Sequence, residues 1–131
     1  MVWSEVFLVL VVCHCAGDFL LQTEFQATRK PGGLGRDPVA RRALLTHIAT
    51  YALPMVAALV WVGTETDALH VALVGVLVLG THLVQDDGRL LVRWVARVKK
   101  TSTPFGSPLW MAIDQSFHLV WLFAAALAAA A

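Results

Sequence analysis

The stretch that decides the fold is residues 2–22, VWSEVFLVLVVCHCAGDFLLQ, a long apolar run with a histidine and an aspartate near its end. Its length is that of a helix that crosses a bilayer, which needs about 17 to 25 residues. Three further apolar stretches follow at 44–62, 69–85 and 109–128. The sequence therefore predicts an all-α polytopic membrane protein, in which residues 1–131 form one bundle of four transmembrane helices.

The composition excludes most other classes of protein. Hydrophobic residues make up 58% of the 131 positions, charged residues only 15%, and the mean hydropathy is +0.69. A soluble domain of this size needs more polar surface, and a disordered chain needs low hydrophobicity with high net charge. The formal charge of +1 gives no basis for binding nucleic acid, so the expected partner is the lipid bilayer.

All ten basic residues lie in two of the connecting segments, five in each. They are Arg29, Lys30, Arg36, Arg41 and Arg42 after the first span, and Arg89, Arg93, Arg97, Lys99 and Lys100 after the third. The segment after the second span carries Glu65 and Asp67 and no basic residue. Because loops rich in Lys and Arg stay in the cytoplasm, we expect these two loops to be cytoplasmic and both termini to lie outside.

The second basic segment has a helical pattern over about 88–100. Its cations Arg89, Arg93, Arg97 and Lys100 recur at spacings of four, four and three, with apolar residues between them. This pattern predicts an amphipathic helix on the inner surface of the membrane, with anionic inner-leaflet lipids as its partner. The helix either anchors the chain or gathers an anionic lipid substrate.

The informative residues are the polar ones within the spans. Those we predict to bind metal are His14, Asp18, His47, His82, Asp86, Asp114 and His118. Six of them form three His/Asp pairs at a spacing of four, which places each pair on one face of a helix. The order is His-then-Asp in the first and third spans and Asp-then-His in the fourth, which runs in the opposite direction. All seven are therefore expected in one band in the cytoplasmic half of the membrane.

The chemistry of this band points to a metal ion. A buried carboxylate is costly unless it is protonated or meets a cation, and the spans hold no Lys or Arg. Carboxylates and imidazoles together bind zinc or another divalent transition metal. Four histidines and three aspartates exceed one tetrahedral ion, which indicates a second ion or a general base beside one ion. Gln22, Tyr51 and Gln115 are expected to hydrogen-bond and orient the ligands.

Four motifs resemble those of the DUF3307 family, small integral membrane proteins of bacteria and phages. They are HCAGDFLLQ at 14–22, HIATY at 47–51, HLVQD at 82–86 and DQSFH at 114–118. The resemblance covers nearly the whole chain and implies a multi-pass protein of the bacterial inner membrane with a shared polar site, but no reaction. One detail departs from the family, because Asp87-Gly88-Arg89 stands where a lysine often follows the third-span aspartate. A looser likeness to membrane-bound metal-dependent hydrolases implies hydrolysis.

Three functions remain open at this point. In the first, a metal-dependent hydrolase of a lipid or lipid-linked substrate, the ligands are His14, His82, His118 and Asp86 or Asp114. The candidate catalytic carboxylates are Asp18, Asp86 and Asp114, of which Asp18 is expected to take a proton from the metal-bound water. The second is an ion- or proton-translocating component, which needs a homo-oligomer because four spans are few for a transporter. The third is a non-catalytic membrane subunit.

Overall fold

The computed structural model describes all 131 residues and contains helices but no strands. Four segments are long and apolar enough to cross a membrane, at Trp3–Leu20, Pro38–Gly63, Ala68–Asp86 and Pro108–Ala129. The prediction of an all-α bundle with four spans is therefore confirmed.

Two of the spans are α-helical throughout, and the other two contain π-helical segments. The uninterrupted spans are α3 (Pro38–Gly63) and α7 (Pro108–Ala129). The first span is α1 (Trp3–Cys15) with η1 (Ala16–Leu20), and the third is α4 (Ala68–Gly75), η2 (Val76–Gly80) and α5 (Thr81–Asp86). Short π-helical segments inside helices often occur at functional sites. Here η1 contains Asp18, and η2 ends two residues before His82.

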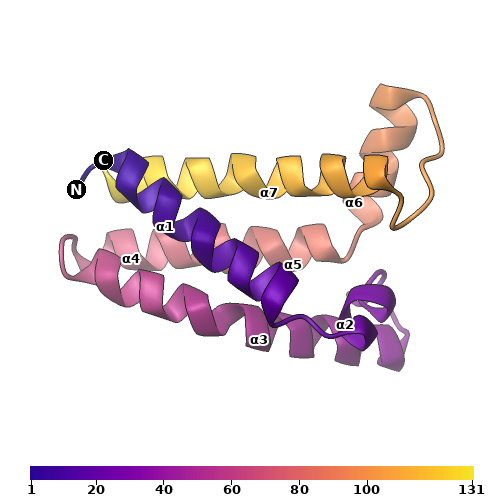
Figure 1. Cartoon of the computed structure of the whole chain (residues 1–131), viewed down its shortest axis with the longest axis horizontal. Helices are drawn as coiled ribbons and strands as arrows, with labels where there is room; N and C mark the ends of the chain where they lie inside the picture. The colour runs from indigo at the N-terminus through magenta and orange to yellow at the C-terminus, as the bar shows by residue number, and fades with distance from the viewer.

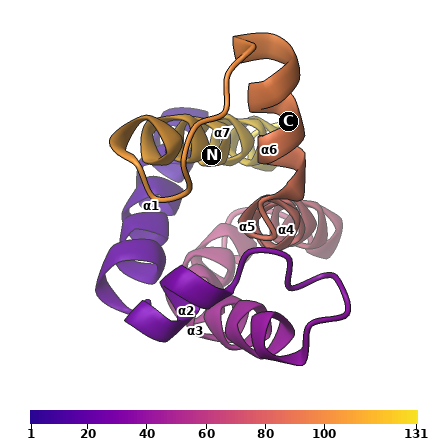
Figure 2. The ribbon, with the colours of Figure 1, turned by 90° about the vertical axis from the view of Figure 1, so that its right-hand side faces the viewer.

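The four spans surround a common centre, and the basic segments gather at one end of them. Figure 1 shows both chain termini at the opposite end. Figure 2, viewed from the basic end, shows α2 (Glu24–Arg29) near the start of α3, and α6 (Arg89–Trp94) beside α7. Helix α6 continues as η3 (Val95–Lys99), so a helix covers most of the predicted basic stretch. A left-handed turn at Gly88, whose φ is 75°, separates α6 from α5 and favours glycine.

Helix α3 begins at Pro38, six residues before the apolar stretch predicted to start at 44. The Asp37 side chain caps it by accepting hydrogen bonds from the amides of Val39, at 2.8 Å, and Ala40, at 3.4 Å. Proline suits the first turn of a helix because its missing N–H has no acceptor there. The helix therefore extends six residues beyond the predicted apolar stretch, because it begins at its cap and not where the hydropathy rises.

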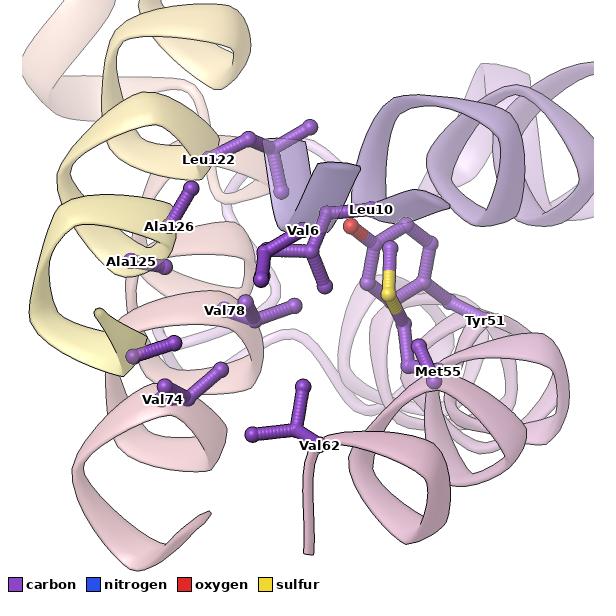
Figure 3. Close-up of a cluster of buried hydrophobic side chains, with 12 residues drawn as sticks. Val6, Leu10, Tyr51, Met55, Val62, Val74, Val78, Leu122, Ala125 and Ala126 are labelled. Atoms are coloured by element: carbon purple, nitrogen blue, oxygen red, sulfur yellow. The ribbon is translucent and has the colours of Figure 1, made fainter. Parts of the chain in front are cut away.

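A hydrophobic core fills the half of the bundle nearest the termini (Figure 3). Its buried members come from all four spans and are Val6, Leu10, Tyr51, Met55, Ala58, Val62, Val74, Val78, Leu122, Ala125, Ala126 and Ala129. Only 31 of the 131 residues are buried, and large apolar side chains such as Leu20 and Leu69 are 81% and 75% exposed. An apolar exterior of this kind fits a lipid environment.

Candidate metal centre

The seven predicted ligands come together in the half of the bundle next to the basic end, beyond the hydrophobic core. Every one of them is buried except Asp114, whose side chain is 20% exposed. Four of them come closest together, one from η1, one from α3 and two from α5. They are Asp18, His47, His82 and Asp86, and each offers one ligand atom to the cluster.

Five of the six separations among the four atoms of this cluster lie between 2.8 and 3.2 Å. His47 Nε2 lies 3.2 Å from Asp18 Oδ1, 2.8 Å from Asp86 Oδ2 and 3.1 Å from His82 Nε2. His82 Nε2 lies 3.2 Å from each of the same two carboxylate oxygens. A tetrahedral zinc ion with bonds of about 2.0 to 2.1 Å holds its ligands about 3.3 to 3.4 Å apart. These five separations are slightly shorter than that.

Hydrogen bonding alone does not satisfy this cluster. Asp18 Oδ1 is buried and has no aligned hydrogen-bond donor, although two imidazole nitrogens lie 3.2 Å away. Each of the two Nε2 atoms also carries at most one proton but faces two carboxylate oxygens and the other Nε2, so one N–H cannot serve all three contacts. One cation between the four atoms satisfies all of them, so the donor set fits a divalent metal ion.

A second group of ligand atoms lies beside the first and shares Asp86. The Nε2 atom of His118 is 3.5 Å from Asp86 Oδ1 and 3.6 Å from Asp114 Oδ2. It is buried without a hydrogen-bond partner. The two oxygens of Asp86 thus face two different groups of ligands, and the second group has only three members.

His14 lies among hydrogen-bonding partners. Its Nδ1 is 3.2 Å from the Tyr51 hydroxyl, and its Nε2 is 2.9 Å from Gln115 Oε1. The Gln115 amide in turn lies 3.3 Å from Asp18 Oδ2 and 3.4 Å from Asp114 Oδ2. His14 also offers one ligand atom to a third group, with His82 and His118, the three histidines named as ligands in the hydrolase hypothesis, whereas the four-member cluster contains His47 and not His14.

The other two residues expected to orient ligands contact histidines. The side-chain nitrogen of Gln22 lies 3.0 Å from His47 Nδ1 and 3.2 Å from His47 Nε2. The Tyr51 ring stacks on His82, with the ring centroids 3.5 Å apart. Close packing holds Tyr51 in place, because a Cβ on Gly17 would lie 2.5 Å from Tyr51 Cδ2. Gly17 therefore allows the first span to approach α3 at the level of the site.

Lys30 is a member of the site that the sequence analysis missed. No span contains a lysine, but Lys30 reaches in from the end of α2 and places Nζ 2.8 Å from Asp86 Oδ2. The three carboxylates of the site, Asp18, Asp86 and Asp114, together with one ammonium carry a net charge of −2 when the imidazoles are neutral. One divalent cation balances that charge.

Asp87 anchors the loop that follows Lys30. Its backbone carbonyl accepts from the Gly32 amide at 2.8 Å, and its buried carboxylate accepts from the Leu34 amide at 2.7 Å. Arg89 donates to the same carboxylate, which raises the pKa of the guanidinium. The adjacent acids in Asp86-Asp87-Gly88 thus have separate partners, one in the ligand cluster and one in the loop.

A cavity of about 270 Å³ connects the site with the basic end of the bundle. Asp18, Asp86 and Asp114 line it together with Lys30 and Gln115. Its remaining walls come partly from α2 and from the loop before α7. A water molecule or the polar part of a substrate therefore has a route to the carboxylates from that end.

The fold and the site define a class: a helical membrane protein with a buried His/Asp cluster that has the donor set of a metal site. The chain belongs to the DUF3307 family, described as a protein of unknown function, which it matches over residues 6–131. The resemblance drawn from the four motifs is confirmed. No curated protein and no solved structure matches the chain.

Proposed function

We propose that this chain binds a divalent transition metal ion, such as zinc, within the membrane and uses it to hydrolyse a lipid or lipid-linked substrate. The observation that carries the proposal is the close convergence of four buried ligand atoms, Asp18 Oδ1, His47 Nε2, His82 Nε2 and Asp86 Oδ2. Orphaned Asp18 Oδ1 and the paired Nε2 atoms support a cation over a hydrogen-bonded network.

A bound metal ion supplies Lewis acidity and lowers the pKa of a coordinated water. The reactive side of the site in this proposal is the group around His118, where Asp86 and His118 would hold the ion and leave positions open for water, and where Asp114 borders the cavity. Asp114 is the proposed general base, since it is the most exposed of the three carboxylates. This assigns to Asp114 the role that the sequence analysis gave to Asp18.

Metal content tests the first half of the proposal. Purified in detergent without added chelator, the wild-type chain should carry at least one zinc ion or equivalent per chain by elemental analysis. His82→Ala should lose it, because both ring nitrogens of His82 face the clustered groups. His70→Ala is the matched control, since His70 lies at the start of α4 and contacts Asp67 instead. A wild-type chain that holds no ion and takes up none on titration contradicts the proposal.

Turnover tests the second half. Vesicles of bacterial lipids should release a soluble phosphate or fatty acid when they contain the metal-loaded chain, and a chelator should stop the release. Asp114→Asn should keep its metal and lose most of the turnover, since its amide cannot take a proton. Full turnover by this variant would remove Asp114 from the proposed role.

A second candidate function, transfer of ions or protons, has its own supporting observation. The rings of His14, His118, His82 and His47 follow one another across the bundle, with successive centroids 4.9, 4.5 and 5.3 Å apart. Such a row suits a proton relay. Metal- or proton-flux across liposomes without any lipid hydrolysis would favour this candidate, and the homo-oligomer it needs stays a prediction.

A further inference from the structure

A groove on the outside of the bundle lies between the third span, α7 and the helix formed by α6 and η3. Its volume is about 710 Å³, which is within the usual range for ligand sites. Nine of its 14 lining residues are hydrophobic, and Val76, Leu90 and Val98 remain more than half exposed. Because two membrane-spanning helices form its long walls, hydrocarbon chains are the ligand chemistry that fits them.

One side of the groove is basic. Arg93 and Arg97 line it, one helical turn apart. The ion pairs that lysine and arginine make in this chain are Lys30–Asp86 and Arg89–Asp87. Arg93 and Arg97 therefore have no acidic partner, and two neighbouring guanidinium groups favour a phosphate group.

The groove also borders the candidate metal centre. Gln85 lines both the groove and the cavity that reaches the carboxylates. Its amide donates to the backbone carbonyl of Asp114, so this one side chain stands between the two spaces. The Gln85 side chain therefore separates the groove, where a phosphate group would bind Arg93, from the cavity that leads to the candidate metal centre.

We propose that this groove binds one anionic phospholipid, with its phosphate on Arg93 and Arg97 and its acyl chains along the apolar walls. Helix α6 runs across the end of the bundle, as a helix at a membrane surface does (Figure 1). One lipid therefore meets the arginines with its headgroup and the spans with its tails. The proposal that the groove binds a lipid depends only on the groove, whereas the proposal that this lipid is the substrate rests on the proposed function.

Native mass spectrometry of the delipidated chain in detergent tests the proposal. Titration with phosphatidylglycerol should give one lipid per chain, bound more tightly than phosphatidylcholine with the same acyl chains. The double variant Arg93→Gln/Arg97→Gln should weaken binding of phosphatidylglycerol about 30-fold, because each arginine near a lipid headgroup contributes about fivefold. The control Arg36→Gln/Arg42→Gln removes the same charge from exposed positions in the other basic segment and should change it less than threefold. Equal binding of both lipids, or equal losses in both double variants, overturns the proposal.

A substitution in the apolar wall of the groove tests, without any change of charge, whether the lipid binds there. Gly80 lines the groove, and a Cβ added there meets nothing closer than Val76 Cγ1 at 4.0 Å. Gly80→Leu should therefore fold, keep its metal and lose at least tenfold in lipid affinity, because its side chain fills the space of the acyl chains. Unchanged lipid binding by this variant overturns the assigned groove.

Two further measurements distinguish a lipid phosphate from a soluble phosphate, and the lipid site from the metal site. Millimolar glycerol phosphate should not displace the bound lipid, and displacement would identify a soluble phosphate as the ligand instead. Lipid binding should persist in chelator, whereas metal content should be unchanged in Arg93→Gln/Arg97→Gln. A chain that binds lipid but no metal refutes only the metal site, and a chain that binds metal but no lipid refutes only the groove.

Discussion

Replacing Lys30 with methionine separates a metal site most sharply from a buried ion-pair network. Nζ lies 2.8 Å from Asp86 Oδ2, so an ion bound to that oxygen at about 2 Å would lie within about 5 Å of the ammonium. At this distance, the repulsion between a divalent ion and one positive charge is about 1.7 kcal/mol even at the dielectric constant of water. Lys30→Met should therefore lower the Kd for zinc by about tenfold or more.

The assay is competition with a chromophoric zinc chelator in detergent. Arg29→Met is the matched control, because it removes the same charge one residue earlier, from an exposed side chain that forms no ion pair. We expect that control to change the Kd less than threefold. If the cluster is only an ion-pair network, Lys30→Met leaves Asp86 buried without its ammonium and destabilises the chain by about 3 to 5 kcal/mol. A folded Lys30→Met chain whose zinc affinity is unchanged or weaker would refute the reasoning.

Three further substitutions probe the supports of the site. Gly17→Ala should lower the melting temperature, because its Cβ would lie 2.5 Å from Tyr51 Cδ2 and overpacking costs about 1 to 3 kcal/mol; an unchanged melting temperature contradicts this. Gln115→Leu removes the amide near Asp18 Oδ2, so zinc affinity should fall about 10- to 100-fold while helicity by circular dichroism stays the same, and wild-type affinity would count against an orienting role. Asp87→Ala removes the acceptor of a loop amide, so hydrogen exchange in the loop after Lys30 should accelerate more than in the spans; uniform acceleration would show that Asp87 supports the whole fold instead.

Much of the site was predictable because its residues are paired along single helices. His82 and Asp86 lie four residues apart, and the helical repeat alone places both on one face. The reversed order of Asp114 and His118 also follows from a span that runs the other way. The position of Lys30 was not predictable in this way, because Lys30 and Asp86 are 56 residues apart in the sequence. Their contact depends on how the loop that follows Lys30, which is rich in proline and glycine, folds back onto the bundle.

The choice among the histidines likewise depended on packing between helices. His14 has an aspartate four residues later and His47 has a tyrosine there, so spacing alone does not indicate that His47 joins a cluster with two carboxylates. In the structure, His47 contributes to the four-member cluster, whereas His14 contacts Tyr51 and Gln115 and offers a ligand atom beside His82 and His118.

The sequence by itself determined that this chain suits a lipid environment, where its four spans lie and which His and Asp residues they contain. It could do so because hydropathy and helical periodicity are local properties of the chain. Only the tertiary structure decided which four ligand atoms converge, that Lys30 joins them, and that an apolar groove with Arg93 and Arg97 borders the same site. The physical reason is that these features depend on side-chain distances of about 3 to 4 Å between different helices. Those distances follow from how the helices pack and where the loops return.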